Sequence, residues 1–178
     1  LRYVDEKQVI TNVAQPLLAR VSRRLPGVVH LGTLDGGMVT YRAKAGARAG
    51  GLFTRVGMQL EAYCSGIGKV LVANLPEAER KDYLKTGPFV PLTERTIIDP
   101  RRLARELDQV RKQGFAVDNG EVADGLVCIA VPIRKPDGAV PAAISLSRVA
   151  PYPRRIALKA QLELLRNVAA QIATGAFG

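Results

Sequence analysis

The strongest constraint on the fold comes from two segments near the end of the chain, which predict a pair of neighbouring inner strands. Leu126–Ile133 is almost entirely apolar, as expected for a strand that is covered on both faces. The turn sequence Pro136-Asp137-Gly138 follows, and Ala139–Ser147 then returns the chain. In this return strand Ile144 and Leu146 face one way and small or polar residues face the other. The small or polar residues are Ala143, Ser145 and Ser147. We expect a polar cavity against their face rather than a filled core.

The rest of the chain alternates between helical and extended patterns. Apolar residues three or four apart predict an amphipathic helix over residues 5–25, with a kink or a new first turn at Pro16. Val28–Leu34 and Met38–Lys44 flank the turn Asp35-Gly36-Gly37 and predict a hairpin. We further expect a loop over residues 45–51 and strands over residues 52–56 and 115–118. Helices are predicted over residues 66–74, 100–114 and 158–172, and a short one begins at Pro76. These patterns predict a mixed α/β (α+β) domain with a central, mainly antiparallel sheet flanked by helices.

Length and composition favour a single globular domain over residues 1–178. A chain of 178 residues with 47% hydrophobic content can bury about two-thirds of the surface that it exposes when unfolded. Its apolar runs fall short of the roughly 18 residues of a membrane span, and we expect no secretory leader and no membrane partner. The first residue is Leu1 rather than Met, which leads us to expect a piece of a longer protein.

A second informative stretch, Gly57–Ala73, joins an extended run to a predicted helix that opens on Ser65, Gly66 and Gly68. Uncapped N–H groups at a helix start point toward bound anions, and the helix dipole favours negative charge there. Glycine has no Cβ, so a ligand can approach the main chain at Gly66 and Gly68. We therefore interpret this helix start as a site for a carboxylate or a phosphate.

The same stretch differs from a nucleotide-binding P-loop, whose pattern is Gly-x-x-x-x-Gly-Lys-Ser/Thr. Tyr63 occupies the first glycine position, and Lys69 is followed by Val70 rather than by a hydroxyl residue. A P-loop is excluded, and a cradle for a small anion is the interpretation that is left.

The cysteines lead us to expect a reducing, cytoplasmic compartment rather than a metal site. Cys64 and Cys128 each lie in an apolar run, as buried free thiols do. The chain has no Cys-x-x-Cys pair and a single histidine, His30, so we expect no zinc and no other metal.

The chain is strongly basic, with 26 Lys and Arg against 16 Asp and Glu and a net charge of +10. Such a charge attracts nucleic acid. The basic clusters are spread along the sequence, however, and the aromatic residues, 5% of the chain, do not interleave with them. The clusters are Arg20, Arg23 and Arg24; Arg101, Arg102 and Arg105; and Arg154 and Arg155. We expect weak, salt-sensitive DNA binding without sequence preference from this segment alone.

A series of motifs in a fixed order resembles the C-terminal effector-binding domain of IclR-type transcriptional regulators. The matching segments are Gly57 with Tyr63–Lys69, Thr93–Ile97, Leu107 with Val110–Ala116, Asp118 with Glu121, Gly125–Ile133 and Ala142–Ser147. The resemblance implies a GAF-like sheet that senses a small organic acid, an aliphatic keto or hydroxy acid or an aromatic carboxylate, without a cofactor and without enzymatic activity. It also implies a homodimer or homotetramer whose DNA contacts come from an N-terminal winged helix-turn-helix domain that this chain lacks.

The resemblance further implies a set of effector-binding residues. The family's carboxylate-binding amides correspond to Gly66 and Ile67, its polar pocket positions to Asp118, Cys128, Ser145 and Ser147, and its apolar walls to Leu52 and Leu60. Taken singly, Cys128 would be a packed thiol and the two serines ordinary sheet residues. The chain departs from the family pattern at Glu61, where proline is common, at Tyr63, where histidine or a small residue is common, and at Gly120, which replaces an acid. Tyr63 places an aromatic hydroxyl at the expected rim of the pocket.

Two other classes of function remain open from the sequence. The first is an enzyme with Cys64 or Cys128 as a nucleophile, which needs a neighbouring base. His30 is the one histidine that could serve, and its apolar strand favours a structural role. The second is a GAF-like module that senses nucleotides and docks on another protein. A ligand-induced change in melting temperature distinguishes nucleotides from small carboxylates.

Overall fold

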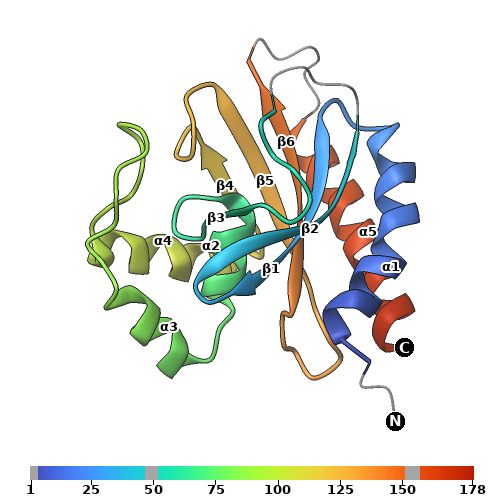
Figure 1. Cartoon of the computed structure of the whole chain (residues 1–178), viewed down its shortest axis with the longest axis horizontal. Helices are drawn as coiled ribbons and strands as arrows, with labels where there is room; N and C mark the ends of the chain where they lie inside the picture. The colour runs from blue at the N-terminus through green and yellow to red at the C-terminus, as the bar shows by residue number, and fades with distance from the viewer. Residues whose placement is uncertain (1–3, 47–51, 151–156) are drawn as a thin grey trace.

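The computed structural model describes residues 4–46, 52–150 and 157–178, and these residues form helices and strands in alternation along the chain (Figure 1). The order is α1 (Glu6–Ser22), β1 (Val28–Asp35), β2 (Met38–Gly46), β3 (Gln59–Glu61), α2 (Gly66–Ala73), α3 (Glu77–Leu84), α4 (Pro100–Gln113), β4 (Ala116–Asn119), β5 (Leu126–Ile133), β6 (Ala142–Val149) and α5 (Leu158–Phe177).

All six of these strands form one sheet in the order β3-β2-β1-β6-β5-β4, and every neighbouring pair is antiparallel. The predicted hairpin of inner strands is confirmed, since β5 and β6 are adjacent and Cys128 lies opposite Ser147. The predicted β1–β2 hairpin is confirmed as well, with Asp35 opposite Met38 at its turn.

Helices cover both faces of the sheet and divide the core in two. Helices α1 and α5 pack side by side on one face, while α2 and α4 lie on the other (Figure 1). The α1/α5 side buries large apolar residues of the inner strands, including Ile144 and Leu146. The α2/α4 side buries Leu103, Leu107 and other residues against smaller strand side chains. The predicted alternation of β6 therefore holds: its large residues face α1 and α5, and its small ones face α2.

Helix α1 continues through Pro16, where the sequence predicts a kink or a new first turn, and it ends at Ser22 rather than near residue 25. Asp5 caps the helix by accepting a hydrogen bond from the Lys7 N–H at 3.0 Å, and the helix then runs unbroken through Pro16. A proline inside a helix leaves the carbonyl four residues earlier without its N–H partner. Pro16 and Asn12 are both exposed, so water can satisfy that carbonyl and no new first turn forms.

The predicted strand over Leu52–Val56 is wrong. This segment is irregular: Phe53 and Val56 are exposed, whereas Thr54 is buried. The edge strand is β3 instead, which begins after Gly57 and pairs with β2. Of the predicted loop over residues 45–51, residues 45 and 46 continue β2 and residues 47–51 lie outside the described residues.

The return strand β6 starts later than predicted, at Ala142 instead of Ala139. Pro141 has no N–H to donate to a strand ladder. The Lys135 N–H also closes the preceding turn by donating to the Ala139 carbonyl at 2.8 Å.

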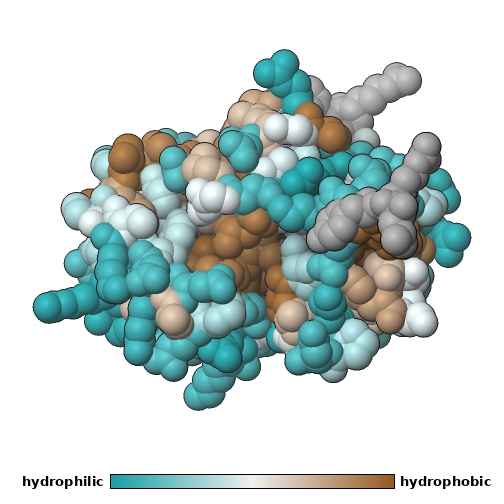
Figure 2. Space-filling view, turned by 60° about the horizontal axis from the view of Figure 1, so that its bottom comes forward, coloured by the Kyte–Doolittle hydropathy of each residue, from teal (hydrophilic) through white to brown (hydrophobic). Residues whose placement is uncertain are grey.

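The lower end of the molecule carries the turns between β1 and β2 and between β5 and β6 (Figure 1). A cavity of about 420 Å³ there is lined by both turns and by α3, with Leu34, Leu75 and Val140 among its walls. Figure 2 shows an apolar hollow in this lower face with polar residues around it.

Candidate functional site

The start of α2 presents two unpaired backbone N–H groups. Ser65 caps the helix, and its hydroxyl accepts a hydrogen bond from the Gly68 N–H at 3.1 Å. The Lys69 N–H bonds to the Ser65 carbonyl at 2.9 Å. Within the described part of the chain, the N–H groups of Gly66 and Ile67 make no hydrogen bond. Two buried donors at the positive end of a helix dipole are suited to an anion.

The two glycines at this helix start differ in what they permit. A Cβ on Gly66 would lie 3.3 Å from the Ala130 Cβ and 3.5 Å from the Cys128 Cβ, which places the helix start directly over β5. A Cβ on Gly68 would fall 2.2 Å from the Ala62 carbonyl oxygen. Gly68 is therefore required by the packing of the preceding backbone, and the approach of a ligand is not needed to explain it.

The sheet beneath this helix start carries two rows of side chains on its α2 face. The first row runs across β4, β5 and β6 as Asp118, Cys128 and Ser147. The second row runs across β4, β5, β6 and β1 as Ala116, Ala130, Ser145 and His30. Antiparallel pairing thus gathers four of the predicted polar residues on one face, next to the free amides of α2. Their role in binding remains a prediction.

Asp118 is fully buried, and its two carboxyl oxygens have different surroundings. Oδ1 accepts a hydrogen bond from the Glu121 N–H at 2.7 Å. Oδ2 has no hydrogen-bond partner among the described residues. Burial raises the pKa of Asp118 to about 7, and the nearby charge of Glu121 acts in the same direction. Near neutral pH this group is therefore present in both its acid and its carboxylate form.

The thiols are held in their protonated form. Cys128 Sγ donates to the Ser147 hydroxyl at 3.1 Å, and burial raises the pKa of Cys128 to about 12. Burial also raises the pKa of Cys64 to about 12. A nucleophilic cysteine needs the opposite shift, and no described contact joins either thiol to His30. The geometry does not support cysteine-based catalysis.

His30, Thr54 and Tyr41 were not predicted as part of this site. His30 Nε2 lies 2.8 Å from the Thr54 hydroxyl, and the ring packs on Tyr41 with centroids 4.6 Å apart. Its Nδ1 is buried without a partner among the described residues. Burial, with the charge of Lys44, lowers the pKa of His30 to about 3, so the ring is neutral. The sequence signal for this group was a single histidine in an apolar strand, and that signal indicated only a structural role for His30.

Lys69 is occupied by partners of its own and cannot contribute a charge to the anion site. Its side chain is 1% exposed, and Nζ contacts Glu121 at 2.7 Å, Glu106 at 2.9 Å and the Val117 carbonyl at 2.6 Å. Burial alone would lower the pKa of Lys69, but attraction to Glu121 and Glu106 raises it above the ordinary value. The anion site proposed from the sequence rests on backbone amides and the helix dipole, and it does not need the Lys69 charge.

The motif Thr93–Ile97 holds the turn that carries Glu121. The Thr93 hydroxyl donates to the Gly120 carbonyl at 2.6 Å, and the Thr96 hydroxyl donates to the Glu121 carbonyl at 2.7 Å. Because Glu121 in turn contacts Lys69, these two threonines fix the turn against α2.

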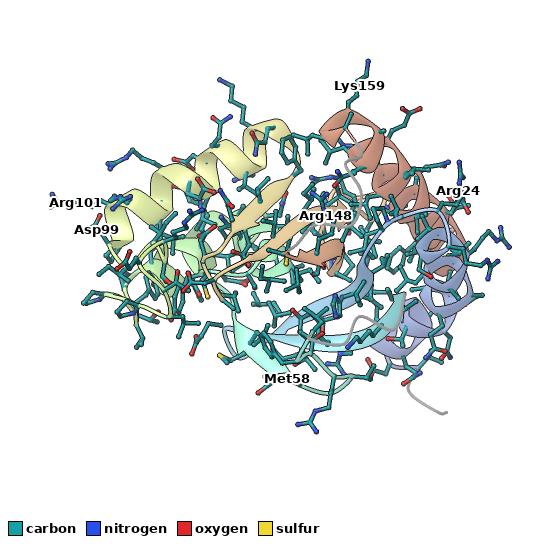
Figure 3. The ribbon with its side chains drawn as sticks, turned by 90° about the horizontal axis from the view of Figure 1, so that it is seen from above. Arg24, Met58, Asp99, Arg101, Arg148 and Lys159 are labelled. Atoms are coloured by element: carbon teal, nitrogen blue, oxygen red, sulfur yellow. The ribbon has the colours of Figure 1, made fainter. Side chains whose placement is uncertain are left out.

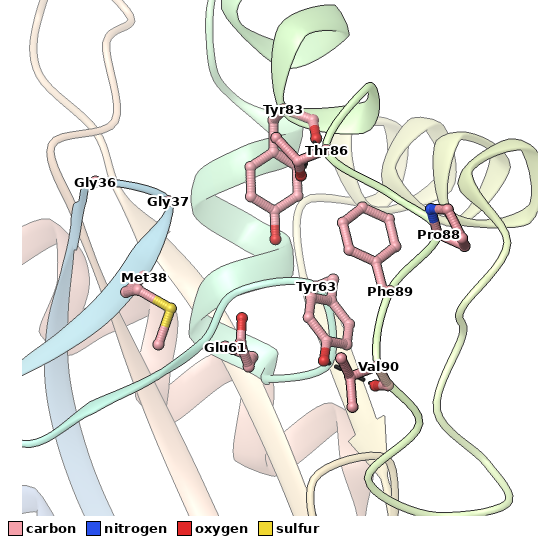
Figure 4. Close-up of a pocket in the computed structure, with 10 residues that line it drawn as sticks. All are labelled: Gly36, Gly37, Met38, Glu61, Tyr63, Tyr83, Thr86, Pro88, Phe89 and Val90. Atoms are coloured by element: carbon pink, nitrogen blue, oxygen red, sulfur yellow. Dashed lines mark hydrogen bonds between the residues drawn. The ribbon is translucent and has the colours of Figure 1, made fainter.

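The apolar residues of the predicted site lie further apart. Leu60 is on β3 opposite Val39 and packs into the α2 side of the core, and Leu52 is half-buried before β3. The Tyr63 hydroxyl donates to the Val90 carbonyl at 2.8 Å, and its ring lines a separate cavity next to α3 (Figure 4). A place for Tyr63 at the effector rim stays a prediction.

The positive charge is distributed over the surface. Arg24 on the α1 side, Arg101 at the start of α4 and Lys159 on α5 point outward on different sides of the molecule (Figure 3). Arg154 and Arg155 lie outside the described residues. Among the described helices, none combines the length and the apolar character needed to cross a membrane.

Comparison with known proteins places this arrangement in a family. A family model described as "Bacterial transcriptional regulator IclR C-terminal" matches residues 2–174. This chain belongs to the IclR family. Among curated relatives, the HTH-type transcriptional regulator XynR of Escherichia coli is 37% identical over 139 residues, 78% of this chain and 55% of XynR. The chain spans about half the length of the curated relatives that it matches.

Solved structures of IclR proteins share the fold. The C-terminal domain of E. coli KdgR has a TM-score of 0.83 and 32% identity, covering 94% of this chain and 98% of that one. An IclR homolog from Microbacterium hydrocarbonoxydans, complexed with 4-hydroxybenzoate, has a TM-score of 0.85 and 26% identity, covering 97% of this chain and 70% of that one. The predicted GAF-like fold is confirmed, and the chain is the effector-binding domain of an IclR-family regulator. Curated relatives such as XynR and KdgR of E. coli are named as transcriptional regulators.

Proposed function

We propose that this IclR domain binds a small organic carboxylate between the start of α2 and the polar rows of the sheet. The observation that carries the proposal is the pair of buried, unpaired N–H groups on Gly66 and Ile67. Unpaired buried donors are costly to a fold, and an anion at a helix start satisfies them. The carboxylate of the ligand accepts these two hydrogen bonds.

The opposite end of the ligand meets groups that can either donate or accept. The Ser145 hydroxyl does both, and Asp118 can donate when it holds a proton. His30 adds an unpartnered Nδ1 on the same face. Together these groups suit a hydroxyl or keto oxygen, on either an aliphatic or an aromatic body. A 4-hydroxybenzoate ligand, as named for the M. hydrocarbonoxydans homolog, combines these two ends and supports this chemical class.

We propose further that effector binding controls a winged helix-turn-helix domain in the same protein, and that the regulator acts as a homodimer or homotetramer. Names such as XynR, an HTH-type regulator of which this chain matches about half, support the separate DNA-binding domain. Two-fold assembly suits regulators that read paired half-sites on DNA.

The proposal is tested first by a thermal-shift screen of small metabolic acids that includes aromatic ones, with a cyclic nucleotide in the same panel. The best acid is then titrated by calorimetry against the double variant Ser145→Ala, Ser147→Ala. We expect a loss of about 1–3 kcal/mol in binding free energy, because ligand groups lose their partners. Ser22→Ala, on α1 at the opposite face, is the matched control and should bind like the parent chain.

The fold of the double variant should persist, since removing two hydroxyls from the α2 face creates no large void. Unchanged affinity in the double variant would place the ligand elsewhere. Stabilisation by the cyclic nucleotide alone would favour a nucleotide sensor instead.

A further inference from the structure

A second cavity, separate from the proposed carboxylate site, lies between the β1–β2 turn, β3, α3 and the segment before α4 (Figure 4). Its volume is about 320 Å³, enough for a small organic molecule. Its ten lining residues are Gly36, Gly37, Met38, Glu61, Tyr63, Tyr83, Thr86, Pro88, Phe89 and Val90. One side chain in this set carries a charge, and it is acidic.

Glu61 supplies that charge from the end of β3. Its carboxylate enters no ion pair or hydrogen bond with the described residues, although the chain has ten more basic than acidic groups. In Figure 4 the side chain points into the cavity, between Met38 and the rings of Tyr63 and Tyr83. An unpaired carboxylate beside a low-dielectric wall attracts a cation more strongly than one in open water.

Aromatic rings form one wall of the same cavity. Tyr63 and Phe89 stack with centroids 4.6 Å apart, and Tyr83 and Phe89 with centroids 5.8 Å apart. Tyr63 and Phe89 are buried, so their positions are set by packing before any ligand arrives. Burial and the charge of Glu61 raise the pKa of Tyr83, which keeps its hydroxyl neutral. The faces of neutral aromatic rings attract ammonium and guanidinium groups.

We propose that this cavity is a binding site for a small organic cation, an ammonium or guanidinium group on a short apolar body. Glu61 pairs with the charge, and the rings of Tyr63 and Tyr83, with the Met38 thioether, contact the body. Basic residues, which would repel such a ligand, are absent from the ten that line the cavity. None of Asp118, Ser145 and Ser147 lines this cavity. Tyr63, which the family resemblance places at the effector rim, is the one predicted effector residue among the ten.

The test uses two probes of nearly the same shape and different charge. Benzylammonium carries the positive charge, and benzyl alcohol is its neutral counterpart. Each is titrated into the 178-residue chain by calorimetry, and its position is mapped from backbone amide chemical shifts. We expect benzylammonium to shift the amides of Gly37, Glu61 and Val90, and to bind more tightly than the alcohol.

Glu61→Gln removes the charge and keeps the shape. This variant should lower the affinity for benzylammonium by about tenfold, equivalent to about 1.4 kcal/mol, and leave the affinity for benzyl alcohol unchanged. Glu94→Gln, an exposed residue, makes the same change in net charge and should bind benzylammonium like the parent chain. Tyr83→Leu tests the aromatic wall separately and should lower the affinity for benzylammonium severalfold.

Three results would overturn the proposal: equal binding of the two probes, unchanged benzylammonium affinity in both Glu61→Gln and Tyr83→Leu, or chemical shifts confined to β5, β6 and the start of α2. None of them depends on whether the carboxylate site is correct, because no acid is present in these titrations.

Discussion

Replacing Asp118 with Asn should remove most of the loss of stability that the parent chain shows as pH rises from about 4 to about 7. The unfolded chain releases the Asp118 proton near the ordinary pKa of 3.8, whereas the folded chain holds it until about 7. Between these values the folded state binds the extra proton, so its stability falls with rising pH and levels off above the folded pKa. A difference of about three pKa units, at about 1.4 kcal/mol each, amounts to about 4 kcal/mol.

Asn has nearly the shape of Asp and cannot ionise. Its carbonyl oxygen can still accept the hydrogen bond from the Glu121 N–H that Oδ1 accepts in the parent chain. The variant should therefore match the parent approximately near pH 3.5 and exceed it by up to about 4 kcal/mol near pH 8. The measurement is urea unfolding of both proteins at about six pH values across this range, with the free energies subtracted at each pH.

Subtraction is necessary because other buried groups also titrate. The pKa of His30 is lowered to about 3, so the parent chain loses stability as pH falls below the ordinary value of 6.5. His30 is present in both proteins, and so are Glu121 and Lys69, the charged neighbours of Asp118. A free-energy difference that does not change with pH would refute the reasoning, since it would mean that Asp118 ionises in the fold at no cost.

Two further predictions concern the packing of α2. Lys69→Met should lower the free energy of unfolding by about 3–5 kcal/mol, because it leaves Glu121 buried without its partner. Lys81→Met breaks an exposed pair with Glu77 and should change the free energy of unfolding in urea little. Similar losses in the two variants would contradict the argument. Gly68→Ala should cost about 3 kcal/mol or prevent folding, because its Cβ would lie 2.2 Å from the Ala62 carbonyl oxygen. A Cβ at Gly66 would lie 3.3–3.7 Å from atoms of Ala130 and Cys128, so Gly66→Ala should melt within a few degrees of the parent chain. Equal melting temperatures for the two alanine variants would show that the backbone near Ala62 gives way easily.

The parts of the fold that the sequence predicted are those set by local patterns. The strand β5 is a continuous apolar run, β6 has a two-residue alternation, and a Pro-Asp-Gly turn joins them. Helix α4 has Asp99 as a cap and Gly114 as its end. The segment Leu52–Val56 failed because three apolar residues in five are compatible with a strand but do not require a partner. In the fold, Thr54 of this segment contacts His30 through its hydroxyl and Lys44 of β2 through its carbonyl.

The strand residues of the candidate site could be placed on one face of the sheet from the sequence, whereas the long-range contacts beside them could not. The register of β4, β5 and β6 follows from hairpin connections, so Asp118, Cys128 and Ser147 could be expected to share a face. The partners of Lys69 could not be predicted from the sequence, because Glu106 and Glu121 lie 37 and 52 residues away along the chain. A lysine in the apolar run from Ile67 to Ala73 was a signal that it must be paired, but it did not identify the partner.

The three contacts of Lys69 have a mechanical consequence. A single ammonium group ties α2 to α4 through Glu106, and to the end of β4 and its following turn through the Val117 carbonyl and Glu121. A ligand that draws the amides of Gly66 and Ile67 toward itself must therefore pull α4 along or break a buried ion pair. The outer side of α4 is exposed and carries Arg101, Arg102, Arg105, Arg111 and Lys112. If a ligand displaced the start of α2, the Lys69 contacts would transmit that displacement to the positively charged outer side of α4.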